Sequence, residues 1–301
     1  MGVPFLRIGM GQKFIKTKLG VIGGSGLYNI EGAKVVREHR PDTPYGPPSD
    51  IIFEMLIGNR SVFFLARHGR KHHVLPSEVN YRANIFAMKK LGVTHLAGIS
   101  AVGSLRVELV PGHFVIPDQL IDCTSKSRPA TFLGDGLVGH FSLADPFCEE
   151  MQGLLKNSAH SKVKLHTGGT YVCIEGPQFS TRAESNFYRG PMQASIIGMT
   201  AIPEARLARE AELSYALLAM VTDYDCWHES EEDVSVESVL KLMKQNSSFA
   251  QQIVIDLIAK LPEVSSAPSL SSAQISLMTP KDQVSAATKA KLEVLYGKYF
   301  V

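Results

Sequence analysis

The sequence has little of what would tie it to a membrane, to nucleic acid or to an oxidising compartment. Its 301 residues include four widely spaced cysteines and no C-x-x-C pair, so neither a disulfide framework nor a zinc site is expected. No apolar run reaches the roughly 20 residues that a membrane-spanning helix needs. The formal net charge of only +2 excludes a strong general attraction to nucleic acid or acidic membranes. We expect a protein of the cytoplasm, with the nucleus as a second compartment.

The composition is that of a soluble globular protein, with 45% hydrophobic and 20% charged residues. Strand and helix patterns alternate from residue 19 to residue 261. Apolar runs at 51–57 and 61–66 flank a short turn and predict a hairpin. Helical spacing over 79–91 is followed by an apolar run at 93–101 that predicts a buried strand. The alternation predicts a single α/β domain with a central mixed β-sheet flanked by helices.

The two ends of the chain differ from this body. Residues 1–18 lack the continuous apolar segment and the cleavage site of a signal peptide, and we expect an N-terminal extension or a remnant of cloning. Residues 263–276 carry six serines and a proline, which is typical of a linker. Helical spacing returns at 281–297. We therefore expect the segment 262–301 to be a linker and a helix that packs on the domain.

Two further helix starts are marked by their residue types. Asp145 followed by Pro146 predicts a helix with an aspartate cap and a proline at its first position. Thr181, with Glu184 three residues later, has the pattern of a capping box.

A pair of carboxylates follows the most apolar run of the chain. Asp223 and Asp225 come directly after residues 217–221. Residues two apart on a strand face the same side, so both carboxylates could meet one ligand. A ring N–H and an exocyclic amine, as in a 6-aminopurine, would suit them. An equally good alternative is a turn in which the aspartates accept hydrogen bonds from loop amides.

Two segments predict an anion site. Gly23–Gly26 follows a strand, and its backbone amides together with the Ser25 hydroxyl could hold an anion, although a plain tight turn explains it nearly as well. Arg67 ends the predicted hairpin, and its planar guanidinium suits phosphate oxygens, with His68 as a further donor. Lys71 and His73 are better explained as part of a solvated basic loop.

Further candidates lie where predicted strands end. Ser100 and Ala101 begin a small-residue segment that lets backbone approach a ligand closely. Phe179 follows a Gly-Pro turn and could stack on a base or ribose, although a core phenylalanine is the commoner case. Thr200 lies at the expected start of a helix, where the dipole favours an anion. Ligands of α/β folds bind at the carboxyl ends of strands, so these positions together indicate one site.

With these residues in view, the chain from about Leu19 to Leu261 resembles the methylthioadenosine phosphorylases of the trimeric purine nucleoside phosphorylase family. The motifs that carry the resemblance are Gly-Gly-Ser-Gly-Leu, Ala-Arg-His-Gly-Arg, Pro-Ser-x-Val-Asn-Tyr, Ile-Glu-Gly-Pro-x-Phe-Ser and Thr-Asp-Tyr-Asp-Cys-Trp. They are specific and are spread over nearly the whole body of the chain.

The resemblance implies a set of site residues. The implied phosphate ligands are Ser25, Arg67, His68, Ser100, Ala101 and Thr200. The implied ribose and base ligands are Phe179, Ser180, Met199, Asp223 and Asp225. His140 and Val236 are implied near the 5′ substituent, with His140 reaching the pocket of a neighbouring subunit in a homotrimer.

The resemblance also implies a reaction, which is the reversible phosphorolysis of 5′-methylthioadenosine to adenine and 5-methylthioribose 1-phosphate. Asp223 would give a proton to N7 of the leaving base, and Asp225 would accept from the N6 amine. Inorganic phosphate is the co-substrate, and neither a metal nor an organic cofactor is expected. The partners expected are small molecules and further copies of the chain, with no nucleic acid and no membrane.

Four positions depart from the usual pattern of the family. Ser25 and Ser100 replace threonine, Val102 replaces cysteine, and Gly198 stands where methylthioadenosine enzymes commonly carry asparagine. Glycine there is more like the 6-oxopurine enzymes. A 6-oxopurine nucleoside phosphorylase is therefore the first alternative, although it would want asparagine in place of an aspartate at the base edge. A nucleoside-binding protein without turnover is the second.

Overall fold

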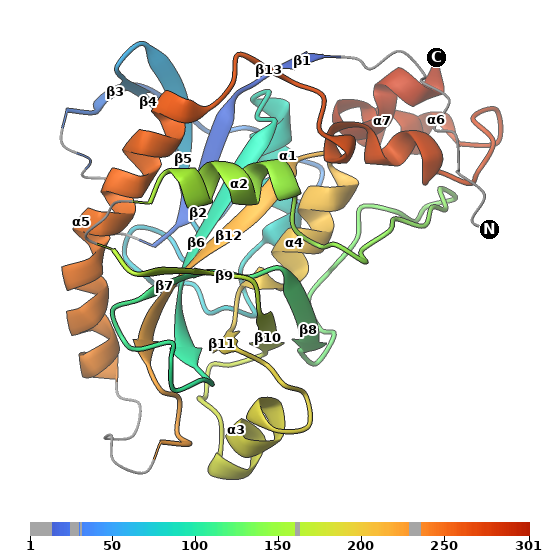
Figure 1. Ribbon diagram of the computed structural model, residues 1–301. Coiled ribbons are helices and arrows are strands. Elements are labelled where there is room, and N and C mark those ends of the chain that lie inside the picture. The colour runs from blue at the N-terminus through green and yellow to red at the C-terminus, as the bar shows by residue number, and fades with distance from the viewer. Residues whose placement is uncertain (1–13, 25–29, 31, 160–162, 229–235) are drawn as a thin grey trace, which may run out of the picture.

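The computed structural model describes residues 14–24, 30, 32–159, 163–228 and 236–301. One large mixed sheet lies at its centre (Figure 1). The strands are β1 (Ile15–Lys16), β2 (Leu19–Gly23), β3 (Lys34–His39), β4 (Ile52–Ile57), β5 (Arg60–Ala66), β6 (His95–Ser104), β7 (Phe114–Ile116), β8 (Gln119–Cys123), β9 (Leu165–Thr167), β10 (Thr170–Ile174), β11 (Ile196–Gly198), β12 (Ser214–Asp223) and β13 (Val264–Ser265).

The sheet has the order β3-β4-β5-β2-β6-β11-β10-β8, while β12 pairs with β6 and β7, and β7 also pairs with β9. Strands β2, β5, β6 and β12 run parallel to their neighbours in this group, whereas β11 runs antiparallel to β6. The long strands β6 and β12 are thus central. Because β2, β5 and β12 share one direction, their carboxyl ends meet at one edge of the sheet, where α/β folds place their ligands.

Helices cover both faces of the sheet. They are α1 (Tyr81–Lys90), α2 (Glu149–Asn157), α3 (Arg182–Arg189), α4 (Ala201–Glu210), α5 (Val236–Lys260), the 3₁₀ helix η2 (Pro268–Ile275), α6 (Ala286–Lys291) and α7 (Glu293–Phe300). Side chains of α1, α4 and α7 join one buried cluster, and side chains of α2 and α5 join another. No helix among the described residues is long and apolar enough to span a membrane.

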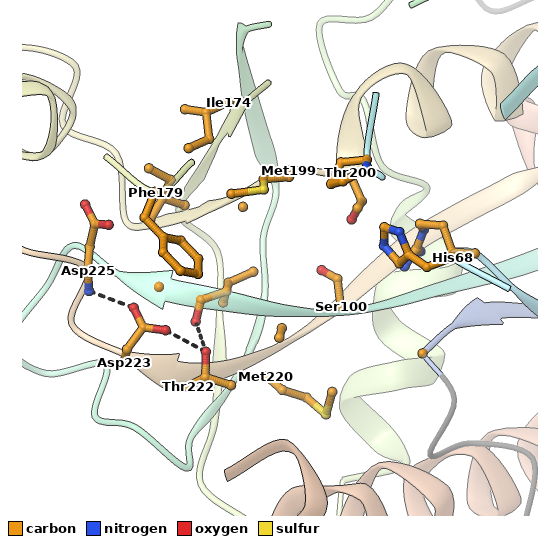
Figure 2. Close-up of a pocket in the computed structure, with 18 of the residues that line it drawn as sticks. His68, Ser100, Ile174, Phe179, Met199, Thr200, Met220, Thr222, Asp223 and Asp225 are labelled. Atoms are coloured by element: carbon orange, nitrogen blue, oxygen red, sulfur yellow. Dashed lines mark hydrogen bonds between the residues drawn. The ribbon is translucent and has the colours of Figure 1, made fainter. Parts of the chain in front are cut away.

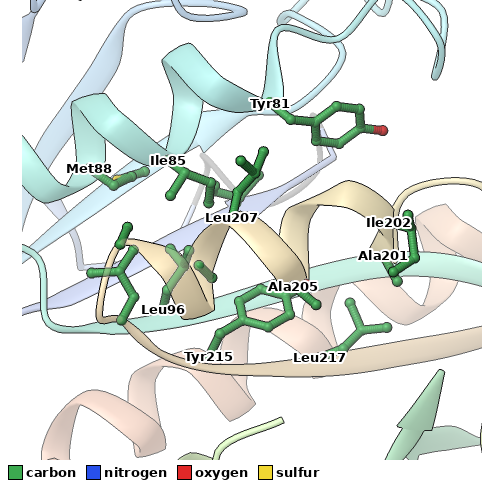
Figure 3. Packing of buried hydrophobic residues seen from close by; sticks show 14 of the residues in the cluster. Tyr81, Ile85, Met88, Leu96, Ala201, Ile202, Ala205, Leu207, Tyr215 and Leu217 are labelled. Carbon is green, nitrogen blue, oxygen red and sulfur yellow. The ribbon is translucent and has the colours of Figure 1, made fainter. Parts of the chain in front are cut away.

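Strand β12 shows how the sequence produces these two cores. Its odd-numbered residues from Tyr215 to Val221 belong to the cluster under α1 and α4, and its even-numbered residues from Ala216 to Met220 belong to the cluster under α2 and α5. Both sets are apolar because both faces of the strand are covered. Figure 3 shows the first cluster, in which α1 and α4 pack over β6 and β12. The run that precedes the two aspartates is therefore a central, doubly buried strand.

The sequence predicts most of these elements well. The hairpin is confirmed by antiparallel β4 and β5, and the helix expected over 79–91 is α1, which Asn80 caps. The capping box of Thr181 and Glu184 is present at the start of α3. The single α/β domain with a mixed sheet is confirmed.

The prediction that a helix starts at Asp145 and Pro146 is wrong. Helix α2 begins only at Glu149, with Cys148 as its N-cap residue. Phe147 is buried in the core, and the Cys148 amide donates to the Tyr215 carbonyl at 2.7 Å. These contacts with the central strand hold the preceding segment in a non-helical conformation.

The C-terminal residues pack on the body of the protein through a buried carboxylate. Glu212 is fully buried, and its Oε1 accepts hydrogen bonds from the Tyr299 hydroxyl at 2.5 Å and the Ala273 amide at 3.1 Å. The serine-rich segment contains the 3₁₀ helix η2 and does not run as an unstructured loop. Residues 15–16, placed in the expected extension, form β1 and pair with β13. The domain boundaries themselves stay a prediction.

Candidate active site

A cavity of about 230 Å³ lies at the carboxyl ends of the central strands. Figure 2 shows Asp223 and Asp225 toward one end, His68, Ser100 and Thr200 toward the other, and Phe179 and Met199 between them. Ten residues singled out in the sequence line this cavity, and they are Arg67, His68, Ser100, Ala101, Phe179, Ser180, Met199, Thr200, Asp223 and Asp225. Positions separated by up to 158 residues of chain therefore come together in one site, as the ends of parallel strands should.

Three other residues were expected in the site. Ser25 and the side chain of Val236 lie outside the described part of the structure. His140 is exposed, and its amide donates to the Ser276 carbonyl at 2.8 Å, away from the residues that line the cavity. Its expected role in a neighbouring subunit stays a prediction.

The cavity has further lining residues that the sequence did not single out for binding. They are His72, Pro76, Ile99, Val102, Gly103, Ile174, Ile197, Gly198, Met220 and Thr222, while Gly24, which also lines the cavity, belongs to the glycine-rich segment expected to hold an anion. Thr222 and Met220 could have been found from their place at the end of the strand that carries Asp223. The apolar members had no signal of their own, because core strands are apolar wherever they run.

At the end of the cavity near His68, Ser100 and Thr200, the guanidinium of Arg67 is held almost entirely by the protein. It is 2% exposed, and its Nε and Nη2 donate to the two Glu204 oxygens at 2.8 and 2.9 Å. Nη2 also donates to the Ile22 carbonyl at 3.1 Å, and Nη1 donates to the Ile99 carbonyl at 2.9 Å. These bonds use four of its five N–H groups, so one N–H on Nη1 is left. Glu204, which pairs with Arg67, was missed by the sequence analysis.

His68 stands beside Arg67 with one ring nitrogen fixed. Its Nδ1 lies 2.9 Å from the Val74 carbonyl, which can only accept, so Nδ1 carries a proton. Burial lowers the pKa of His68 to about 4, and the positive charge of Arg67 contributes to the fall. In the neutral ring Nε2 is therefore an acceptor, which differs from the donor role expected from the sequence.

Two hydroxyls at the same end have no partner. The Oγ of Ser100 and the Oγ1 of Thr200 are buried and make no hydrogen bond to any described residue. Buried polar groups are nearly always satisfied, so such a pair indicates the place of a ligand. Thr200 is the N-cap residue of α4 and yet makes no side-chain cap bond. Its hydroxyl therefore remains available.

One buried arginine that the sequence analysis missed joins the segments around the cavity. Arg128 is 5% exposed, and its Nε donates to Glu175 Oε1 at 2.7 Å while its Nη2 donates to the Glu175 carbonyl at 2.6 Å. Its Nη1 donates to the carbonyls of Met199 at 2.6 Å and Ile202 at 2.9 Å. The strand end before Phe179 and the segment before α4 are thus fixed relative to each other. An arginine in a serine-rich loop gave no sign of this role.

At the opposite end Asp223 accepts two hydrogen bonds. Its Oδ1 accepts from the Asp225 amide at 2.8 Å, and its Oδ2 lies 2.7 Å from the Thr222 hydroxyl. Burial raises the pKa of the Asp223 carboxyl, and the charge of Asp225 adds to the rise, although the two hydrogen bonds oppose it. The Thr222 hydroxyl also lies 3.2 Å from the Val102 carbonyl, so it can donate there when Asp223 holds a proton.

The geometry of the aspartate pair differs from the expected one. Strand β12 ends at Asp223, and Asp225 follows in a turn with a φ of 51°, so strand alternation does not place its side chain. Asp225 still lines the cavity, and its Oδ2 is buried without a hydrogen-bond partner among the described residues. Burial raises the pKa of this carboxyl too. Both interpretations of the pair are partly correct, because Asp223 accepts from a loop amide and both carboxyls face the cavity.

The structure also accounts for Gly198. A Cβ at this position would lie 2.0 Å from the Tyr171 hydroxyl oxygen, so the place of a side chain is already filled. The described residues contain no cluster of three or more histidine, cysteine, aspartate or glutamate side chains that could hold a metal ion.

Comparisons with known proteins identify the family of the chain. The model of the phosphorylase superfamily matches residues 18–259. The S-methyl-5'-thioadenosine phosphorylase of Geobacter sulfurreducens is 49% identical over 93% of this chain and 98% of that protein. The enzyme of the same name from Saccharolobus solfataricus is 49% identical over 82% of this chain and 91% of that protein.

Solved structures give the same result. A methylthioadenosine phosphorylase from an antarctic soil metagenomic library has a TM-score of 0.86 and 46% identity, covering 93% of this chain and 99% of that one. The methylthioadenosine phosphorylase of Schistosoma mansoni in complex with adenine has a TM-score of 0.77 and 41% identity, covering 81% of this chain and 91% of that one. With the family model spanning the whole sheet and half of all residues shared with such relatives, the chain belongs to the phosphorylase superfamily and, within it, to the methylthioadenosine phosphorylases.

Proposed function

We propose that the protein catalyses the reversible phosphorolysis of 5′-methylthioadenosine, giving adenine and 5-methylthioribose 1-phosphate. The observation that carries the proposal is the polarity of the cavity. Unpartnered hydroxyls of Ser100 and Thr200 lie at one end, and carboxyls with raised pKa values lie at the other. A nucleoside between them would place its sugar near the hydroxyls and its base near the carboxyls.

The phosphate would bind beside Arg67. Its oxygens would accept from the remaining Nη1 N–H and from the hydroxyls of Ser100 and Thr200, while Ala101 and Ser25 would add contacts from neighbouring strand ends. A phosphate oxygen then attacks C1′ of the ribose as the bond from C1′ to N9 breaks. The anion also stabilises the positive charge that develops on the sugar.

The base would leave with the help of Asp223. Breaking the glycosidic bond puts negative charge on the purine, and a protonated carboxyl at N7 makes the leaving group neutral. General acid catalysis of this kind contributes about 10²- to 10⁴-fold. The buried position of Asp223 favours the protonated form that this step needs.

Asp225 would select the base. An ionised carboxylate accepts from the exocyclic amine of adenine and repels the oxygen of a 6-oxopurine. Phe179 and Met199 would contact the base and the ribose, and Ser180, which also lines the cavity, would add a polar contact. The aspartate at this position favours methylthioadenosine over the 6-oxopurine nucleosides of the first alternative.

The assembly proposed is a homotrimer in which a neighbouring subunit completes each site. The exposed side chains of Val138, Ile275 and Met278 lie around a bridge between Gly139 and Leu277, directly beside His140. An apolar surface of this kind suits a second copy of the chain. His140 of one subunit and Val236 of the other would then face the 5′ group.

Phosphate is the co-substrate proposed, with no metal and no organic cofactor. The adenine released would be reused for purine synthesis and the methylthioribose unit for methionine synthesis, so the protein would act in purine and methionine salvage. The compartment proposed is the cytoplasm, with the nucleus as a second location.

The test is incubation of the purified protein with methylthioadenosine, with and without phosphate, while adenine release is followed by chromatography. We expect release only with phosphate, and binding without release would instead indicate a nucleoside-binding protein. Inosine in place of methylthioadenosine tests the 6-oxopurine alternative. Adenosine should react at least about tenfold less efficiently, because the apolar Val236 proposed near the 5′ group would leave its 5′-hydroxyl without a partner. Equal rates for the two adenine nucleosides would contradict the proposed 5′ pocket.

A further inference from the structure

Tyr171 and Gly198 form a matched pair beneath the phosphate end of the cavity. They lie on the parallel neighbours β10 and β11, and Tyr171 is completely buried. A Cβ at position 198 would lie 2.0 Å from the Tyr171 hydroxyl oxygen and 2.7 Å from Cζ of its ring. The tyrosine therefore occupies the space that only a glycine leaves free.

The Tyr171 hydroxyl reaches the residue that caps helix α4. The backbone amide of Thr200 donates to this hydroxyl at 3.4 Å. On the same peptide, the Met199 carbonyl accepts from Arg128 Nη1 at 2.6 Å. Two buried side chains thus hold the segment between Met199 and Thr200, one through a carbonyl and the other through an amide.

This arrangement separates the two polar groups of Thr200. Its amide is bonded to the protein through Tyr171, whereas its hydroxyl is buried without a partner. The peptide between Met199 and Thr200 is thus held at its carbonyl by Arg128 and at its amide by Tyr171. These two bonds fix the backbone position from which the Thr200 hydroxyl reaches the cavity.

We propose that Tyr171 is a positioning residue of the phosphate half of the site, acting through Thr200, and that Gly198 is required because of it. The inference rests on the proposed phosphorolysis. Tyr171 is not among the residues that line the cavity, so it would act on the anion through Thr200.

The test is Tyr171→Phe, which keeps the ring in the core and removes the oxygen. We expect the KM for phosphate to rise roughly three- to tenfold, as for the loss of one hydrogen bond. The KM for methylthioadenosine at saturating phosphate should stay within about twofold of the wild type. The matched control is Tyr296→Phe, because Tyr296 is fully buried in α7 and its hydroxyl has no partner among the described residues. This control should leave both KM values unchanged.

An unchanged phosphate KM in folded Tyr171→Phe would overturn the inference, and so would an equal rise of both KM values, which indicates a merely structural role. If the variant does not fold, Gly198→Ala tests the same contact, because its new methyl group displaces the hydroxyl. A rise of the phosphate KM by at least threefold supports the inference there, and an unchanged phosphate KM contradicts it. Failure of the proposed function looks different, because the wild type itself would then show no phosphate-dependent release of adenine.

Discussion

At the end of the cavity proposed to bind phosphate, a full positive charge on Arg67 is neutralised by Glu204, and the groups left for a ligand are two neutral hydroxyls and one N–H of Arg67. At the base end, Asp223 and Asp225 have no ion pair with any cation among the described residues, and burial raises both pKa values. One end therefore keeps its charge and compensates it inside the protein, whereas burial at the other end favours the protonated form of its carboxyls. The first arrangement suits binding an anion, and the second suits giving a proton to a leaving group.

The largest effect on activity is expected from removing the acidic proton of Asp223. Asp223→Asn keeps the size of the side chain and can still donate a hydrogen bond, but an amide cannot transfer a proton to N7. We expect kcat for methylthioadenosine to fall by about 10²- to 10⁴-fold with little change in the phosphate KM. Asp118→Asn, which removes a carboxylate outside the cavity that accepts from the Gly169 amide, is the control. A kcat within a few-fold of the wild type would remove Asp223 from the mechanism.

At the phosphate end, Glu204→Gln should have its main effect on stability. The substitution leaves the buried Arg67 charge without its anionic partner, and breaking such a pair costs about 3–5 kcal/mol of unfolding free energy. Denaturant unfolding measures this loss. In the folded fraction, the uncompensated charge should attract phosphate, so the phosphate KM should fall.

The outcome that contradicts this account is a Glu204→Gln variant with wild-type stability. Arg206→Lys is a useful control, because its ion pair with Asp122, at 2.7 Å, is partly exposed and is expected to contribute little.

Asp225→Asn sharpens the comparison by changing what the base end recognises. The amide can donate to an oxygen at position 6, whereas the carboxylate can only accept and repels it. The ratio of kcat/KM for methylthioadenosine to that for inosine should fall roughly 5- to 150-fold, which corresponds to a free-energy difference of about 1–3 kcal/mol. If the ratio of the two values of kcat/KM is the same in the variant and the wild type, Asp225 does not contact position 6.

The sequence predicted which residues gather at the cavity better than it predicted how their side chains are arranged. The aspartates, Ser100 and Thr200 were found because they follow apolar runs, and the carboxyl ends of buried strands meet at one edge. The route to Asp225 was wrong, because a positive φ of 51° cannot be inferred from alternation. Glu204 was seen only as part of a helix, and nothing in its neighbours showed that its carboxylate pairs with Arg67, 137 residues away.

Arg128 and Tyr171 show why the rest could not be predicted. Both act through backbone groups of residues far away in the sequence, namely Met199 and Thr200. Such contacts depend on how strands and loops pack in three dimensions. The same holds for Pro146, whose local preference for a helix start lost to the burial of Phe147 beside it.

The smallest predicted effect concerns the pH dependence of the phosphate end. Burial, with help from Arg67, lowers the pKa of His68 to about 4, below the value of about 6.5 in an unfolded chain. Between these values the unfolded chain binds the proton and the folded protein does not, so stability from His68 is complete above pH 6.5 and is lost as the pH falls toward 4. Relative to His68→Gln, the wild type should lose about 1–2 kcal/mol more unfolding free energy between pH 7 and pH 5. Exposed His140→Gln is the control, and equal pH slopes for the wild type and His68→Gln would show that His68 is not held neutral by its surroundings.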